Sequence, residues 1–70
     1  EISEKIKEIC KTPTIFEDIL QQIFKVFNLT MDINQYVLAG STIRSFLAYL
    51  KDEGQIDFEI SDSKVYWKSL

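Results

Sequence analysis

Histidine is absent from this 70-residue sequence, and cysteine and proline occur once each. Without histidine the chain lacks the commonest general base and the commonest metal ligand. A single thiol, Cys10, can form neither an internal disulfide nor a thiolate cluster for zinc or iron. The two glycines, Gly40 and Gly54, are isolated, so the chain has no glycine-rich phosphate loop. We therefore expect no catalytic residue, metal site or cofactor site in this segment.

Cations and long apolar runs are also scarce. Eight Lys and Arg residues stand against eleven Asp and Glu residues, which gives a formal net charge of -3. This balance disfavours nucleic acid as a partner, because binding to phosphates requires an excess of cations. No apolar run approaches the roughly 18 residues that span a bilayer, so no membrane partner is expected. A chain with one reduced thiol and no membrane span is typical of the cytoplasm.

Length limits the chain to one compact domain over residues 1–70, because two cores would leave each half too small to fold alone. The sequence does not begin with methionine, and its first residues already follow a helical pattern. We therefore expect it to be a segment of a longer protein.

Two helical patterns occupy the first part of the chain. Isoleucines at three- and four-residue spacing predict a short amphipathic helix over residues 2–11, with Cys10 as a small buried residue, and Pro13 follows its end. Thr14 with a glutamate three residues later is the pattern of a capping box and predicts a second helix over residues 15–28. The apolar positions of this second helix are Ile15, Phe16, Ile19, Leu20, Ile23, Phe24, Val26 and Phe27.

Two further helices are expected after a connection over residues 28–31. Asp32, with a glutamine three residues later, predicts the start of a short helix that runs to Ala39 and is closed by Gly40. Ser41 then caps the last helix. Its apolar positions, at offsets of 0, 3, 4 and 7, are Ile43, Phe46, Leu47 and Leu50.

Apolar periodicity changes from helical to alternating after Gly54, where the last helix should stop. Ile56, Phe58 and Ile60 alternate with polar residues and predict a strand. Turn-forming residues at 61–63 and a second alternating run at 64–68 complete a terminal β-hairpin.

This order of elements predicts a mostly α fold with a small β-hairpin, an α+β winged helix-turn-helix. The turn Ala39-Gly40-Ser41 would join the two helices of the helix-turn-helix motif, and the hairpin would form the wing.

The winged-helix prediction raises the possibility of DNA recognition. From Ser41 onward, however, four cations stand against five acidic residues, so this part of the chain should repel phosphates on balance. Arg44 is then better interpreted as a solvated helix residue or as a member of an intrachain ion pair. The groove-facing candidates, if DNA is bound, are Ser41, Thr42, Arg44 and Ser45 on the last helix and Lys64 and Lys68 on the wing.

Aromatic residues make up 13% of the chain, more than a small core readily hides. The aromatic residues at or near expected exposed faces, where amphipathic rings suit a protein interface, are Tyr36, Tyr49, Tyr66 and Trp67. For Trp67 the alternative is that its ring covers the open side of the sheet against Phe58.

Four stretches of the chain also resemble a known domain: Gln35-Tyr36-Val37-Leu38, Ser41-Thr42-Ile43-Arg44-Ser45, Leu47-Ala48-Tyr49-Leu50-Lys51-Asp52-Glu53-Gly54 and Tyr66-Trp67-Lys68. They are similar to the C-terminal winged-helix domain of bacterial hydrolases with the metallo-β-lactamase fold. Phe46 departs from the pattern, because some relatives have histidine there.

The resemblance implies a non-catalytic accessory domain at the C-terminal end of a longer chain. Its partner would be the catalytic domain of the same polypeptide, which would hold the zinc. By motif match, the interdomain contacts would be Tyr36, Arg44, Tyr49 and Trp67. Cut free from its partner, such a domain could self-associate through the exposed patch. The alternatives are a winged-helix DNA-binding transcription regulator and a small winged helix that recruits proteins into a larger assembly.

Overall fold

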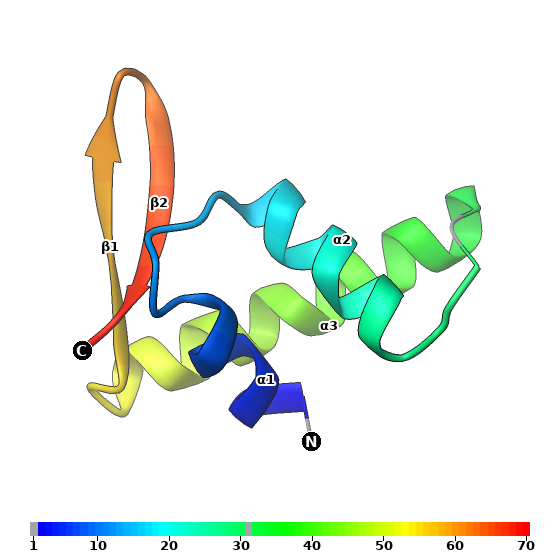
Figure 1. Cartoon of the computed structure of the whole chain (residues 1–70), viewed down its shortest axis with the longest axis horizontal. Helices are drawn as coiled ribbons and strands as arrows, with labels where there is room; N and C mark the ends of the chain where they lie inside the picture. Colours follow the sequence, from blue (N-terminus) through cyan, green and yellow to red (C-terminus); the bar gives the residue numbers. More distant parts are fainter. Residues whose placement is uncertain (1, 31) are drawn as a thin grey trace.

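The computed structural model describes residues 2–30 and 32–70, so expectations that involve Glu1 and Met31 lie outside the described residues. Figure 1 shows three helices followed by an antiparallel hairpin. The elements are α1 (Ile2–Ile9), α2 (Phe16–Val26), α3 (Ile33–Asp52), β1 (Ile56–Ser61) and β2 (Lys64–Ser69). This is an α+β, winged-helix-like topology, which confirms the fold class expected from the sequence. No described helix is long and apolar enough to cross a membrane.

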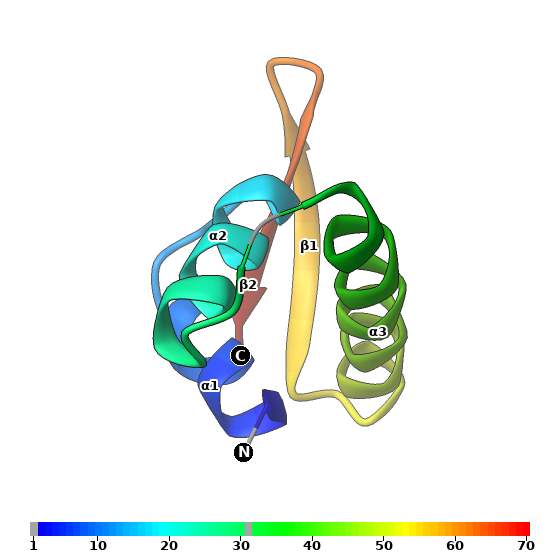
Figure 2. The same ribbon diagram turned by 90° about the vertical axis from the view of Figure 1, so that its right-hand side faces the viewer.

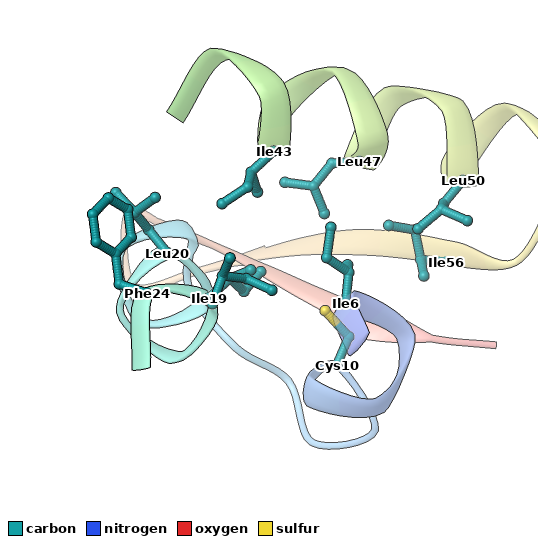
Figure 3. Packing of buried hydrophobic residues seen from close by; sticks show 10 residues of the cluster. Ile6, Cys10, Ile19, Leu20, Phe24, Ile43, Leu47, Leu50 and Ile56 are labelled. Carbon is teal, nitrogen blue, oxygen red and sulfur yellow. The ribbon is translucent and has the colours of Figure 1, made fainter. Parts of the chain in front are cut away.

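One apolar core joins the three helices to the base of the hairpin (Figure 3). Each helix presents one stripe of apolar side chains to it, as the three- and four-residue spacing requires. Phe46, expected at the centre of the α3 stripe, packs beside the core and remains partly exposed. Among the described residues, the buried apolar side chains are Ile6, Cys10, Ile19, Leu20, Ile23, Phe24, Ile43, Leu47, Leu50 and Ile56.

The predicted turn at Ala39-Gly40-Ser41 is wrong, because α3 continues through it as one helix of 20 residues. Gly40 is buried against α2, and a Cβ atom built on it would lie 3.8 Å from the Phe16 ring. A glycine inside a helix weakens it by roughly 1 kcal/mol, which packing against a neighbouring helix readily offsets. The helix pair expected on either side of Gly40 is therefore formed instead by α2 and α3.

The two predicted capping boxes have different outcomes. Asp32 caps α3, since its Oδ1 accepts a hydrogen bond of 2.9 Å from the backbone N–H of Gln35. Thr14 does not cap α2, whose N-cap is Ile15 without a side-chain hydrogen bond. Thr14 is instead held extended by two backbone hydrogen bonds with Trp67, of 2.9 and 2.8 Å. Pairing with β2 thus takes Thr14 out of the cap position.

Gly54 ends α3, as expected, with a positive φ of 74°. The backbone N–H groups of Gly54 and Gln55 donate to the carbonyl oxygens of Lys51 and Leu50, at 3.0 and 2.9 Å. A left-handed residue after a helix satisfies the last carbonyl groups in this way, and glycine adopts that conformation without strain.

The hairpin turns tightly through Asp62 and Ser63, both with positive φ. Its register places Phe58 opposite Trp67 and Ile60 opposite Val65. Because β2 pairs with β1 on one side and bridges to Thr14 on the other, β2 is central and β1 is the outer edge. The far end of the hairpin projects beyond the helices (Figure 2).

Candidate interaction surfaces

Tyr36, expected as an interdomain contact, forms a hydrogen bond within the chain instead. Its hydroxyl group donates a hydrogen bond of 2.5 Å to Glu17 Oε2 on α2. This bond, strengthened by the charge of the carboxylate, raises the pKa of the Tyr36 hydroxyl above its ordinary value of 10.0. Tyr36 therefore fastens the first half of α3 to the first turn of α2.

Arg44 also faces α2. Its guanidinium carbon lies 4.2 Å from the centroid of the Phe16 ring, within the range of a cation–π contact. Tyr36, Gly40 and Arg44 follow one another at four-residue spacing, so they form a stripe on one side of α3. This stripe packs on Phe16 and Glu17, so two of the four expected interdomain contacts serve the helix pair instead.

Trp67 is partly buried and packs against the core. Its ring centroid lies 5.5 Å from that of Phe58 at an interplanar angle of 58°. The alternative interpretation of Trp67, a ring that covers the sheet against Phe58, is therefore confirmed. Tyr49, also carried over from the resemblance, has 56% of its surface exposed and, among the described residues, makes no contact of the kind that holds Tyr36, Arg44 and Trp67.

The DNA-contact candidates do not form a cationic surface. Ser41 and Ser45 lie one turn apart on the exposed side of α3, and the Thr42 hydroxyl group donates to the carbonyl oxygen of Leu38 at 3.1 Å. On the hairpin, Lys68 Nζ lies 2.9 Å from Glu59 Oε1. This hydrogen bond raises the pKa of Lys68, so the ammonium group is held by a carboxylate. Lys64 is exposed beside the hairpin turn.

Five exposed apolar residues near the end of α2 and the start of α3 were not singled out from the sequence as an interaction surface. The groove between these elements has a volume of about 370 Å³, and Phe27, Leu29 and Leu38 line it together with core residues. Ile33 and Leu38 are 73% and 63% exposed. We call Phe27, Leu29, Ile33, Val37 and Leu38 the α2–α3 apolar surface.

A sequence signal for this surface existed in the pair Val37-Leu38. In a continuous α3, Ile43, Leu47 and Leu50 define the side that faces the core, and at about 100° per residue both Val37 and Leu38 lie more than about 100° away from that side. The predicted helix end at Gly40 separates this segment from the Ile43–Leu50 stripe, so the prediction does not specify which of its sides faces the core.

Cys10 is fully buried in the core. Desolvation raises the pKa of its thiol from 9.0 to about 11, so the thiol stays protonated at neutral pH. The expectation of a small buried residue at this position is confirmed.

No family model matches the chain, and neither a curated protein nor a solved structure matches it significantly.

Proposed function

We propose that this winged-helix-like domain is a non-catalytic docking domain, which packs on another folded domain through the α2–α3 apolar surface. The observation that carries the proposal is the exposure of Ile33 and Leu38, which leave most of their apolar surface in water. The five residues together expose on the order of 500 Å², about as much as the largest apolar patch of a typical monomer. Burying that area against a partner contributes roughly 25 cal/mol per Å² of favourable free energy, from which the entropic costs of association are subtracted.

The docking surface extends along α3 to Tyr49. Leu38 and Tyr49 are eleven residues apart, which is three helical turns, so they lie on the same side of the helix. Tyr49 exposes its ring at the other end of that side. Aromatic rings with a polar tip are favoured at protein interfaces, so Tyr49 suits the rim of the docking surface.

The proposed partner is a catalytic domain with the metallo-β-lactamase fold in the same polypeptide. The resemblance of four stretches to the accessory domain of such hydrolases supports this choice. The zinc belongs to that partner in the proposal, and the described residues offer no group of three His, Cys, Asp or Glu side chains that could hold a metal ion.

A charge placed on the docking surface should separate the two domains. In the full-length protein we expect Leu38→Asp to increase the rate of protease cleavage between the domains at least about tenfold, because a carboxylate cannot be buried unpaired. Hydrolase turnover should fall while the metal content, measured by elemental analysis, stays unchanged.

The matched control is Ser63→Asp, which adds the same charge at the hairpin turn, where an aspartate tolerates a positive φ. It should behave as the wild type. If Leu38→Asp leaves both the cleavage rate and the turnover unchanged, the α2–α3 apolar surface does not face the hydrolase domain. A full-length reading frame without a His-x-His-x-Asp-His motif would exclude that partner altogether.

DNA recognition is the second candidate, because the topology is winged-helix-like and Ser41 and Ser45 are exposed on α3. The net charge of -3 disfavours it. In a fluorescence anisotropy titration at physiological salt we expect duplex DNA to bind no more tightly than about 10 μM, weaker than specific readers. Submicromolar binding to one sequence that is lost in Ser45→Glu would favour the transcription regulator instead.

A further inference from the structure

The outer edge of β1 carries backbone groups that no other strand uses. Trp67 directs its N–H and C=O groups to Thr14, so its cross-strand neighbour Phe58 belongs to a non-hydrogen-bonded pair with it. The backbone groups of Phe58 therefore point away from β2. Ile60, two residues further, has the same orientation. In Figure 1, β1 lies on the outer side of the hairpin, and β2 lies between β1 and the segment that leads into α2.

These outward groups are nearly unpaired. Among the described residues, their one partner is the Asp57 side chain, whose Oδ1 accepts a hydrogen bond of 2.8 Å from the Phe58 N–H. The side chains beside this edge are apolar on one face of the hairpin, where Ile60 is 69% exposed and Phe58 about half as much. An exposed strand edge flanked by apolar side chains is a template for pairing with another chain.

The other face of β1 is acidic. From residue 52 to residue 62 the chain has five acidic residues and no basic one. Two of them, Asp57 and Glu59, alternate with Phe58 and Ile60 along β1. The edge thus offers carboxylates on one face and apolar contacts on the other, where Lys51 Nζ lies 5.6 Å from the centroid of the Phe58 ring.

The pairing of β1 with β2 shows which chemistry complements this strand. β2 places Lys68 directly opposite Asp57, and Lys68 Nζ binds Glu59 Oε1 at 2.9 Å. On the apolar face, Trp67 and Val65 lie opposite Phe58 and Ile60. On the acidic face β2 presents Lys64, Tyr66 and Lys68, so a strand that alternates cationic or polar residues with apolar ones is the partner that β1 already accepts on its inner side.

A second copy of the chain does not fit the open edge. Antiparallel pairing of β1 with another β1 would bring Asp57 and Glu59 of both copies together, and like charges across strands are destabilising. The outer edge of β2 in another copy is also occupied, at Trp67 by Thr14 and at Ser69 by the carbonyl oxygen of Cys10.

We propose that the open edge of β1 binds an extended segment of another protein that alternates Lys or Arg with apolar residues, and that this segment adds to the hairpin as a third strand. Main-chain hydrogen bonds to Phe58 and Ile60 provide affinity, and the alternating side chains provide specificity. The Asp57 carboxylate then releases the Phe58 N–H, which binds the incoming strand, and instead contacts the Lys or Arg side chains of that strand. This surface lies at the opposite end of the molecule from the α2–α3 apolar surface (Figure 1) and is independent of the docking proposal.

The test is a titration of the 15N-labelled chain with the capped peptide acetyl-Lys-Val-Lys-Ile-Lys-Val-Lys-amide, followed by NMR. We expect the largest shift changes at the amides of Phe58 and Ile60, with slowed hydrogen exchange at Ile60. Raising NaCl from low to high concentration should weaken binding several-fold, because the carboxylates are exposed and screened. The same peptide with Glu in place of Lys should bind at least tenfold more weakly.

Two proline variants separate edge pairing from general attraction of charge. Ile60→Pro removes the outward N–H of β1, and Val65→Pro removes that of the residue opposite, which points to the other edge. Neither N–H belongs to the β1–β2 ladder, so the hairpin should persist in both, which its cross-strand shifts will report. We expect Ile60→Pro to lower the affinity for the peptide about tenfold. Val65→Pro should leave the affinity unchanged.

The proposal is overturned if the peptide binds Ile60→Pro as tightly as the wild type, if the Glu peptide binds equally well, or if no binding is seen at millimolar peptide. Shift changes confined to Leu29, Leu38 and their neighbours would also overturn it, and would assign peptide binding to the α2–α3 apolar surface.

Discussion

Leu47→Ala should lower the free energy of unfolding by about 3 kcal/mol, because Leu47 is 2% exposed and lies in the core between α3 and the other elements (Figure 3). The change removes three buried carbon atoms and leaves a cavity that the surrounding side chains fill only in part. A domain of this size has little stability to spare, so much of the variant should be unfolded near 37 °C. Urea denaturation followed by circular dichroism measures the effect.

Leu38→Ala is the matched control, since it makes the same change nine residues earlier on the same helix. Leu38 is largely exposed, and alanine is a better helix former, so the free energy of unfolding should change by less than about 0.5 kcal/mol. If Leu47→Ala and Leu38→Ala lower the free energy of unfolding equally, the core does not lie on the Leu47 side of α3.

Gly40→Pro should disrupt the domain, with an expected loss of about 3 kcal/mol or more. At position 40 the proline ring would clash with the carbonyl group of Tyr36 and remove a hydrogen bond from the middle of α3. Gly40→Ala should instead stabilise the helix by about 0.5–1 kcal/mol, because the added methyl group meets Phe16 at ordinary contact distance. Thermal unfolding should show a lower melting temperature than the wild type for Gly40→Pro and a higher one for Gly40→Ala.

Ile33→Pro is the control for the proline substitution. Ile33 is the first residue of α3 and is exposed, and proline is favoured at that position because its missing N–H has no helical partner. Its melting temperature should stay within a few degrees of the wild type. Tolerance of proline at both positions would mean that the chain does turn at Gly40.

The sequence predicted the elements whose signals are local. Isoleucine spacing located α1, alternation located both strands, and Gly54 marked the end of α3. The break at Gly40 was wrong because a lone glycine has the same appearance at a helix end as inside a packed helix. Only the position of Phe16 on α2 distinguishes the two, and that contact is not visible in the sequence around Gly40.

Surface residues were harder to predict than the fold. Tyr36 and Arg44 were expected to be available to a partner, but both are held by α2, through Glu17 and Phe16. These contacts depend on how two helices cross, which helical periodicity does not specify. The exposure of Leu38 depends in turn on the continuity of α3. Tyr49 was placed correctly because its surroundings are set by its own helix.

The hydrogen bonds of Ser69 join the two ends of the chain. Its N–H donates to the carbonyl oxygen of Cys10 at 2.8 Å, and its hydroxyl group donates to that of Lys7 at 2.6 Å, across 62 residues of sequence. Closing a loop of that length costs roughly 4 kcal/mol of chain entropy before any contact compensates for it. An isolated helix of eight residues is unstable in water, so α1 depends on its packing against the rest of the core and on these bonds to Ser69. Although most of the structure is helical, we therefore expect it to fold more slowly than a helical protein with only local contacts, because its native state includes this pairing of the two chain ends.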